Sequence, residues 1–182
     1  MLKKAWRLRL KALRAENNSA EVQAAHRAVE ALAASDARIA GGYSPLGSEP
    51  DVLQMLMAWA VAAPDRQLAL PYADGCGGLS YRLWRPGEAF VPDGAGIPSS
   101  SGPSVLPDFV LTPCLGFSES CRRLGYGGGY FDRWLAALGA RRPVLCGIAA
   151  EACLVPEDVF AEHDLPLDLI ATERRLLRLR QL

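Results

Sequence analysis

Four glycines within five residues make residues 122–133, R-R-L-G-Y-G-G-G-Y-F-D-R, the densest candidate for chemistry in the chain. Glycine lets the backbone bring several N–H groups to one point, and a helix expected to begin near Gly129 directs its positive end there. Arg122 and Arg123 add cations that bind phosphate oxygens in pairs. Asp132, in the first turn of that helix, is a candidate ligand for a hard cation. These residues predict an anion cradle.

Two common phosphate-binding patterns do not fit these glycines. No Lys-Ser or Lys-Thr pair follows them, as a P-loop requires, and their spacing is not Gly-x-Gly-x-x-Gly. A tight strand-to-helix turn that needs glycine explains the residues equally well. At this point both interpretations stay open.

Alternating helix and strand patterns surround the glycines and must position them. Apolar residues recur every three or four positions over residues 2–13 and 22–32, which predicts two helices. Asn18 and Glu21 have the spacing of a capping box at the start of the second helix. Further helices are expected after residues 48–51 and after the glycines. Short apolar runs predict strands at 38–40, 67–70, 79–84, 109–111, 144–149 and 169–171, the last in the chain. The proline- and serine-rich residues 85–107 predict a long loop.

This alternation predicts an α/β fold of three layers, with a largely parallel sheet covered by helices on both faces. Ligands of such sheets bind beyond the carboxyl ends of the strands. We therefore expect the site at the loops after Tyr43, Leu70 and Leu111. Residues 1–182 are expected to form a single domain, with the helical pair 1–35 packed on it.

The composition argues against several classes of protein. The 182 residues include 20 basic and 20 acidic side chains, so no overall positive field attracts nucleic acid or anionic lipid. The longest apolar runs, such as residues 58–63, are far too short to span a membrane. Five cysteines without a C-x-x-C pair argue against a disulfide framework. We expect a cytoplasmic monomer or weak homodimer, without nucleic-acid or membrane partners. The basic residues 1–14 leave a mitochondrial presequence as an alternative.

The segment R-L-G-Y-G-G-G-Y-F-D-R resembles the strongest motif of the 5-formyltetrahydrofolate cyclo-ligases, also called methenyltetrahydrofolate synthetases. Other family motifs follow in the same order over nearly the whole chain. They match Lys3 with Arg7, residues 43–49 (Y-S-P-L-G-S-E), Leu70-Pro71, Asp108 with Pro113, residues 163–168 (H-D-L-P-L-D) and Thr172-Glu173. The resemblance implies a Rossmann-like, NagB-like fold whose sheet is largely parallel or mixed.

The resemblance also implies an activity that depends on ATP and Mg2+. Enzymes of this family convert 5-formyltetrahydrofolate to 5,10-methenyltetrahydrofolate and release ADP and phosphate. Phosphorylation of the formyl oxygen makes it a good leaving group, and the neighbouring amine then closes the ring. The protein must mainly position the reactants and neutralise charge.

Roles carry over from the family residue by residue. Arg123 and Tyr130 are implied to be catalytic. The residues implied to bind ATP are Lys3, Arg7, Arg123, Leu124, Gly125, Tyr126, Gly127, Gly128, Gly129, Tyr130 and Phe131. Those implied to bind the folate are Tyr43, Glu49, Tyr126, Gly128 and Tyr130. Glu49 would hydrogen-bond the amide and amine edge of the pterin. Asp132 and Asp164 would hold Mg2+.

Simpler explanations stay open for several of these residues. Lys3 and Arg7 also fit a solvated helix face. Glu49 also fits an acid that favours a helix N-terminus. Asp164 also fits a residue that caps a loop.

Two stretches depart from the family pattern. The family has Phe-Asp-x-x-Gly before the glycine loop, but residues 117–121 are F-S-E-S-C, so an aspartate is lost and Cys121 replaces a glycine. Glu119 is a candidate substitute for the lost acid. Residues 96–100, G-I-P-S-S, lack the family's Glu-Pro pair. These changes leave open a relative that binds folate or nucleotide without closing the ring. A third alternative is an interaction module that uses the basic first helix.

Overall fold

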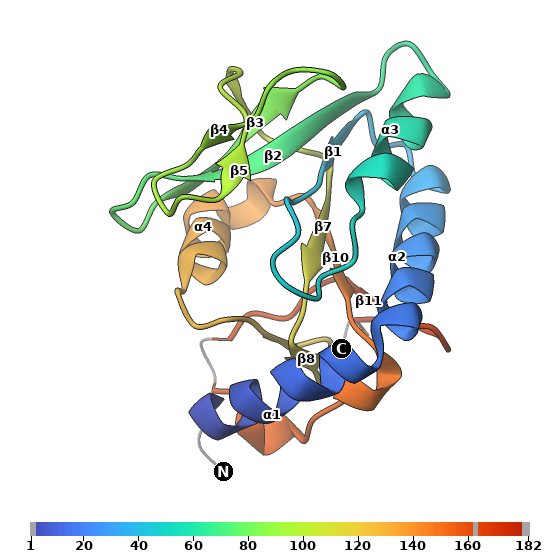
Figure 1. Ribbon diagram of the computed structural model, residues 1–182, viewed down its shortest axis with the longest axis vertical. Coiled ribbons are helices and arrows are strands. Elements are labelled where there is room, and N and C mark those ends of the chain that lie inside the picture. Colours follow the sequence, from blue (N-terminus) through green and yellow to red (C-terminus); the bar gives the residue numbers. More distant parts are fainter. Residues whose placement is uncertain (1–2, 162–163, 180–182) are drawn as a thin grey trace.

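Five short apolar strands pair in parallel at the centre of one mixed sheet (Figure 1). The structure, a computed structural model, describes residues 3–161 and 164–179, so His163 lies outside the described residues. Within them the strand order is β12-β11-β10-β7-β1-β2-β3-β6. The strands are β1 (Ile39–Gly41), β2 (Gln67–Ala73), β3 (Leu79–Trp84), β6 (Ser104–Val105), β7 (Phe109–Pro113), β10 (Val144–Ile148), β11 (Leu169–Ala171) and β12 (Leu176–Arg178). Strands β3, β6 and β12 run antiparallel to their neighbours, so the sheet is mixed.

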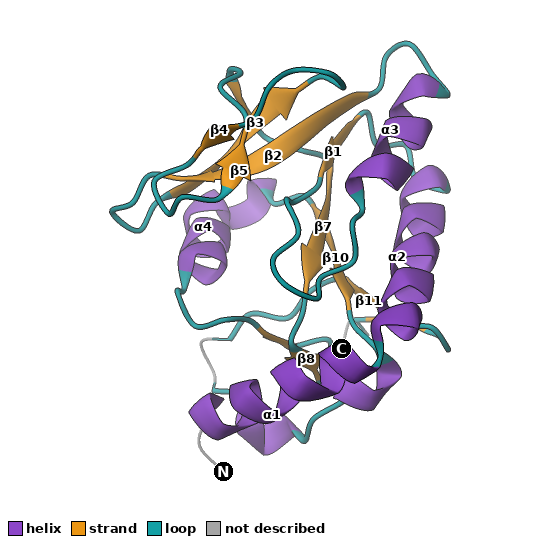
Figure 2. Cartoon of the chain, in the orientation of Figure 1, coloured by secondary structure: helices purple, strands orange, loops and turns teal. Residues whose placement is uncertain are grey.

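Helices cover both faces of the sheet, which confirms the predicted three layers (Figure 2). Helices α2 (Asn18–Ala33) and α3 (Leu53–Val61) cover one face, and α4 (Tyr130–Leu138) covers the other. The small buried side chains of Ala24, Ala25 and Ala28 let α2 approach the sheet closely. On the opposite face the ring of Trp134 contacts Tyr81, with centroids 5.0 Å apart. None of the described helices has the length and apolarity that a membrane span needs.

Helix α1 (Lys3–Glu16) crosses the carboxyl end of the parallel strands (Figure 1). It packs beside the 3-10 turn Glu151–Cys153, which follows β10. Helix α1 packs closely against Gly116, because a Cβ added at that glycine would lie 2.7 Å from Cδ1 of Leu10. This packing carries the basic residues of α1 to the edge of the sheet where ligands of α/β proteins bind.

Two segments differ from the sequence prediction. Residues 85–107 are not simply a loop, because β4 (Val91–Pro92) pairs with β5 (Pro98–Ser99) and β6 extends the sheet. The hydroxyls of Ser99 and Ser100 donate to the carbonyl oxygens of Pro71 and Leu83, which anchors this segment to β2 and β3. The chain also continues past the predicted last strand into β12, after a turn in which Thr172 accepts backbone N–H groups.

Glu21 does not complete the capping box predicted with Asn18. Helix α2 begins without a side-chain hydrogen bond at its cap, and the carboxylate of Glu21 is fully buried elsewhere. It accepts hydrogen bonds from Arg14 at 3.2 Å and from the N–H of Ala150 at 2.9 Å. Glu21 therefore binds partners outside α2 instead of forming a local cap, and the N-cap position is Asn17 rather than Asn18.

Candidate functional site

The glycine loop leaves a two-stranded hairpin and enters a helix. The hairpin pairs β8 (Gly116–Phe117) with β9 (Arg123–Leu124), and α4 begins at Tyr130, next to the position predicted for its start. Gly127 and Gly129 have φ of +103° and +68°, a region that favours glycine. A Cβ at Gly127 would also lie 3.1 Å from Cζ of Arg7. The conformation therefore favours glycine at Gly127, and any larger residue would also press against the guanidinium of Arg7.

The loop forms one wall of a pocket of about 250 Å³ at the carboxyl end of the sheet. The pocket is lined by Arg7, Leu46, Ile97, Arg123, Leu124, Gly125, Tyr126, Gly127, Gly128, Gly129, Tyr130, Phe131, Asp132 and Asp164. The fold thus gathers most of the residues predicted to bind ATP and both predicted metal ligands from segments far apart in sequence. Leu46 and Ile97 were not predicted to belong to this site. Leu46 nevertheless lies in the loop expected after Tyr43 and in the motif 43–49, and Ile97 lies in the stretch 96–100 that departs from the family pattern.

Two guanidinium groups supply the positive charge of the pocket. Arg7 donates a hydrogen bond from Nε to the carbonyl oxygen of Gly125 at 2.8 Å. Arg123 lies over the ring of Phe131, with Cζ 4.4 Å from the ring centroid. Its buried Nε has no hydrogen-bond partner among the described residues. An unpaired buried donor on a cation, beside N–H groups freed by glycine, suits an anionic ligand.

Lys3 and Arg122, two other basic residues expected at the site, do not line the pocket. Lys3 does not line the pocket but forms an ion pair with Asp164, which does. Arg122 donates to the carbonyl oxygen of Ala161 at 3.3 Å and does not line the pocket. Of the two adjacent arginines before the loop, the structure therefore brings only Arg123 to the pocket.

The two predicted metal ligands lie on the same pocket but form no closed metal cage. Asp132 is in the first turn of α4, and Asp164 accepts the N–H of Ala161 at 2.6 Å. No group of three or more His, Cys, Asp or Glu suited to a metal ion is found among the described residues. Mg2+ is commonly held by one or two carboxylates together with water and phosphate oxygens. The donors present fit that kind of ion.

Tyr43 and Glu49 are buried and do not line the pocket, although both are predicted to bind the folate. The hydroxyl of Tyr43 donates to the carbonyl oxygen of Pro50 at 3.1 Å. Glu49 accepts the N–H of Leu46 at 2.8 Å, and Nη1 of Arg14 lies between Glu49 and the hydroxyl of Tyr126, at 3.7 and 3.2 Å. Tyr126 does line the pocket and is 44% exposed, so it connects Glu49 to the pocket.

Burial has the largest effect on the pKa values of Glu49 and Tyr126. Burial raises the pKa of Glu49, while the N–H of Leu46 and the charge of Arg14 act against that rise. Burial and the neighbouring Glu49 raise the pKa of Tyr126 to about 12. Tyr126 is therefore a neutral hydrogen-bond donor at physiological pH.

The sequence did not predict that Arg14 and Glu21 belong to the buried charged cluster around Glu49. Arg14 is buried, and it contacts Glu21, Glu49 and Tyr126. Its position, four residues after the buried Leu10, places it on the inward face of α1. That spacing was the available signal, but a basic residue in a basic helix suggested solvent exposure instead.

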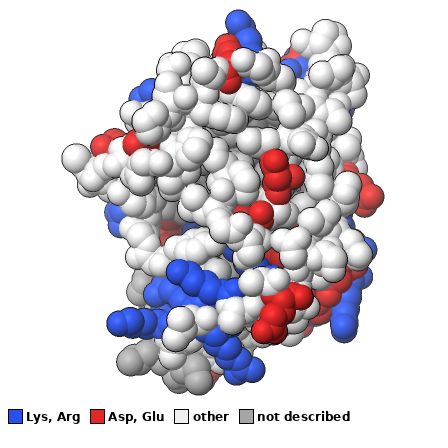
Figure 3. All heavy atoms as spheres, viewed as in Figure 1, with Lys and Arg blue, Asp and Glu red and all other residues white. Residues whose placement is uncertain are grey.

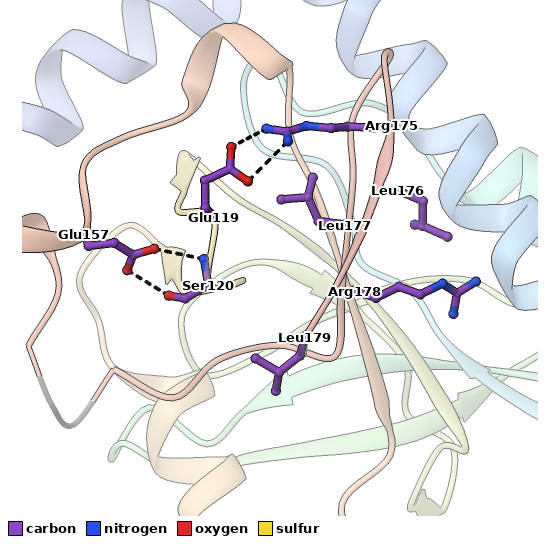
Figure 4. Close-up of a pocket in the computed structure, with 8 residues that line it drawn as sticks. All are labelled: Glu119, Ser120, Glu157, Arg175, Leu176, Leu177, Arg178 and Leu179. Atoms are coloured by element: carbon purple, nitrogen blue, oxygen red, sulfur yellow. Dashed lines mark hydrogen bonds and ion pairs between the residues drawn. The ribbon is translucent and has the colours of Figure 1, made fainter. Parts of the chain in front are cut away.

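The residues that depart from the family pattern have structural partners. Ser118 is buried and lies 3.0 Å from Ser120, oxygen to oxygen. Glu119 does not face the glycine loop but binds Arg175 through both carboxylate oxygens, at 2.6 and 3.2 Å (Figure 4). It therefore does not replace the lost acid. Cys121 is buried with φ of +60°, the one non-glycine residue in that region among those described.

A larger groove, of about 930 Å³, lies beside Glu119 and β12, away from the glycine loop. Both of its carboxylates already have partners, because Glu119 pairs with Arg175 and Glu157 accepts hydrogen bonds from Ser120 (Figure 4). The smaller pocket has the unpaired donor and the convergent charges, so it is the better candidate site.

Basic side chains gather over α1 on one face of the molecule (Figure 3). Some of these basic side chains have partners within the protein, because Arg14 is buried and Arg7 binds the carbonyl oxygen of Gly125. Arg9 and Lys11 stay exposed and lie over the rings of Trp6 and Tyr126, with distances of 5.3 and 5.1 Å to the centroids. The helix is thus only partly the solvated basic face considered from the sequence.

Comparison with known proteins gives a consistent result. A sequence model of the 5-formyltetrahydrofolate cyclo-ligase family matches residues 2–173. The 5-formyltetrahydrofolate cyclo-ligase of Escherichia coli strain K12 is 34% identical over 76 residues, 40% of this chain but only 42% of that protein. The enzyme of the same name from Mycolicibacterium smegmatis is 28% identical over 145 residues, 73% of this chain and 72% of that one.

The fold also matches a solved structure. The NMR structure of Aquifex aeolicus 5,10-methenyltetrahydrofolate synthetase superimposes with a TM-score of 0.76 and 23% identity. The match covers 100% of this chain and 94% of that one. At this identity the likeness supports the shared fold alone.

Proposed function

Since the chain belongs to the 5-formyltetrahydrofolate cyclo-ligase family, we propose that it uses ATP and Mg2+ to convert 5-formyltetrahydrofolate to 5,10-methenyltetrahydrofolate. The observation that carries this proposal is the pocket beside the glycine loop. Two guanidinium groups, a glycine backbone and two carboxylates converge there from three segments of the chain. These groups match what a phosphoryl-transfer reaction needs, because its main demands are positioning and charge neutralisation.

ATP, when bound, supplies the phosphoryl group that turns the formyl oxygen into a leaving group. On the protein side, Arg7 and Arg123 neutralise phosphate charge, and the N–H groups around Gly127 and Gly129 bind phosphate oxygens. Arg123 keeps an unpaired Nε for this purpose. We assign a direct catalytic role to Arg123 and to Tyr130, which both line the pocket.

Asp132 and Asp164 are the proposed ligands of Mg2+. A bound Mg2+ ion would supply positive charge at the phosphate oxygens. Lys3 pairs with Asp164 in the described structure. We propose that Lys3 exchanges this carboxylate for a phosphate oxygen when the nucleotide binds, so that the ion pair between Lys3 and Asp164 no longer competes with the metal.

The folate is proposed to lie against Tyr126, Gly128 and Tyr130, with Glu49 and Tyr43 behind them. A carboxylate can accept two hydrogen bonds from the amide and amine edge of a pterin. Glu49 is suited to this role because it is buried and already fixed by the N–H of Leu46. Holding the pterin in this way would bring the formyl oxygen and the ring-closing amine into one orientation.

The decisive test is turnover. Purified protein is mixed with 5-formyltetrahydrofolate, ATP and Mg2+, and the near-ultraviolet absorbance of the methenyl product is followed. Product that requires both ATP and Mg2+ supports the proposal. Absence of product, from protein whose cooperative thermal unfolding shows that it is folded, contradicts it.

A second candidate is a relative that binds folate or nucleotide without closing the ring. The observation that favours it is Cys121, which holds a strained left-handed conformation next to β9 and the glycine loop. Titration with 5-formyltetrahydrofolate, with turnover measured in parallel, distinguishes the two. Binding without product identifies the second candidate.

The same proposal treats residues 1–182 as one domain, with the pair of N-terminal helices packed on it. We further propose a cytoplasmic monomer or weak homodimer, with no nucleic-acid or membrane partner. The balanced charge of the sequence supports this part of the proposal.

A further inference from the structure

One cation is completely buried at the end of α1. The guanidinium of Arg14 has no solvent exposure and serves three partners. Its Nη2 lies 3.2 Å from Glu21, and its Nη1 lies 3.2 Å from the hydroxyl of Tyr126 and 3.7 Å from Glu49. A buried ion pair stabilises a fold weakly, and apolar residues of similar volume often replace it at no loss of stability. Packing alone therefore does not account for Arg14.

Arg14 is anchored to a rigid part of the molecule through Glu21. One carboxylate oxygen of Glu21 binds Arg14, and the other accepts the N–H of Ala150 at 2.9 Å. Ala150 follows β10, whose strand lies inside the parallel part of the sheet. The pair Arg14–Glu21 thus links α1, α2 and the carboxyl end of a central strand.

The other side of Arg14 faces the two groups proposed to meet the pterin. Tyr126 belongs to the glycine loop and lines the pocket, and its hydroxyl accepts a hydrogen bond from Arg14, whose guanidinium also lies beside Glu49. Glu49 also accepts the N–H of Leu46, so its carboxylate is held from two directions. Arg14 fixes where this carboxylate and this hydroxyl point.

Charge is unevenly distributed in the buried cluster formed by Arg14, Glu21 and Glu49. A single guanidinium neutralises two carboxylates, those of Glu21 and Glu49. The other charged or titratable groups that act on Glu49 are Tyr43, Tyr126 and Arg123. Burial raises the pKa of Glu49, and the attraction of Arg14 is one of the effects that oppose this rise. Removing Arg14 would therefore raise the pKa of Glu49 further.

We propose that Arg14, held by Glu21, is a positioning residue that aims the carboxylate of Glu49 and the hydroxyl of Tyr126 at the pterin of the substrate. This inference rests on the proposed function. Arg14 itself does not line the pocket and is not assigned to touch either substrate.

Two measurements on three variants test the proposal. The first is the pKa of the Glu49 carboxyl in the ligand-free protein, from carbon NMR of labelled glutamate. The second is the KM for 5-formyltetrahydrofolate compared with the KM for ATP. The variants are Arg14→Gln, Arg14→Lys and Glu21→Gln. Arg38→Gln is the matched control, because it removes one exposed cation whose side chain pairs with Asp65 alone among the residues that the structure describes.

Each variant has a distinct expected result. Arg14→Gln raises the pKa of Glu49 and raises the folate KM about tenfold or more, while the ATP KM stays near that of the wild type. Arg14→Lys keeps a charge but not the planar fork, so it restores the pKa more fully than the folate KM. Glu21→Gln lowers the pKa of Glu49, because it removes a like charge and leaves Glu49 as the carboxylate that Arg14 neutralises.

The outcomes separate this inference from the proposed function. Wild-type protein without turnover or folate binding contradicts the proposed function, and with it the substrate role of Arg14. Wild-type turnover together with an unchanged Glu49 pKa in Arg14→Gln overturns this inference alone, as do equal changes in the two KM values. If Arg14→Gln does not fold, Arg14→Lys and Glu21→Gln decide the question by the same two readouts.

Discussion

Arg7 on α1 donates a hydrogen bond from Nε to the carbonyl oxygen of Gly125 at 2.8 Å, so the first helix holds the glycine loop across 118 residues of sequence. The same guanidinium occupies the space that a Cβ at Gly127 would need. The loop and the helix therefore determine each other's position. A ligand that binds the loop will also contact α1.

Arg7→Met should weaken ATP binding. The variant keeps the aliphatic stem but loses the charge and the hydrogen bond to Gly125, so we expect the Kd for ATP to rise about tenfold or more. Isothermal titration calorimetry with ATP and Mg2+ measures this. Arg9→Met, an exposed arginine of the same helix, is the control. Equal Kd values for the two variants would remove Arg7 from the proposed ATP site.

Glu49→Gln should weaken the folate much more than ATP. The substitution keeps the shape of the side chain but replaces an ionised acceptor with a neutral amide, and we expect a loss of about tenfold or more in folate affinity. Titrations with each ligand measure the ratio. Asp51→Asn, two residues later at the start of α3, is the matched control. Equal losses for both ligands would contradict the pterin role of Glu49.

Asp132→Asn should abolish Mg2+-dependent turnover and leave the fold intact. The side chain is in the first turn of α4 at the pocket wall, so the loss of charge affects metal binding more than packing. Turnover is measured over a range of Mg2+ concentrations, and Tm by calorimetry. Asp65→Asn, an exposed aspartate far along the chain, serves as the control. Full activity of Asp132→Asn at low Mg2+ would show that the metal assignment is wrong.

Cys121→Gly should cost less stability than its burial suggests. Deleting a fully buried thiol is destabilising, but here glycine also relieves a left-handed conformation worth about 1–2 kcal/mol. Cys114→Gly is the control, because Cys114 is equally buried without that conformation. We expect urea unfolding to show a loss about 1–2 kcal/mol smaller for Cys121→Gly than for Cys114→Gly. A loss as large as that of Cys114→Gly would mean that Cys121 is not strained.

Glu157→Gln should make the protein less sensitive to acid. Partial burial acts to raise the pKa of Glu157, but the hydroxyl and the N–H of Ser120 bind its carboxylate and lower the pKa below its usual value. A carboxylate with a lowered folded-state pKa contributes stability above the unfolded-state pKa, and this contribution is lost as the pH falls through the folded-state pKa.

The free energy of unfolding is measured in urea between neutral pH and about pH 3. The wild type should lose more stability over this range than Glu157→Gln does. Glu30→Gln, on the exposed side of α2, should follow the wild type. A wild-type curve that runs parallel to that of Glu157→Gln would show that the bonds from Ser120 do not stabilise the charged form.

The amino-acid sequence by itself was enough to predict the layered α/β fold, the order of its main elements and the glycine loop before α4. These features depend on local causes: apolar periodicity, the conformational freedom of glycine and the breaks at proline. The edge strand β12 and the pairing within residues 85–107 escaped prediction. The segment 85–107 depends on hydrogen bonds to distant partners, from Ser99 to Pro71 and from Ser100 to Leu83. Strand β12 pairs with the neighbouring β11 across a turn closed by the hydroxyl of Thr172, a local signal that the short apolar pattern of 176–178 did not reveal.

Tertiary structure alone decided which charged side chains belong together. Arg7 and Arg14 belong to the same helix and have similar neighbours in sequence. Arg7 lines the pocket, whereas Arg14 is buried between two carboxylates. Glu21 has the spacing of a local cap but binds the end of a central strand instead. Glu119 adjoins the glycine motif in sequence but pairs with Arg175 away from the pocket. A charge finds its partner through space, so sequence spacing could predict that residues 123–132 lie together but not the buried network beside them.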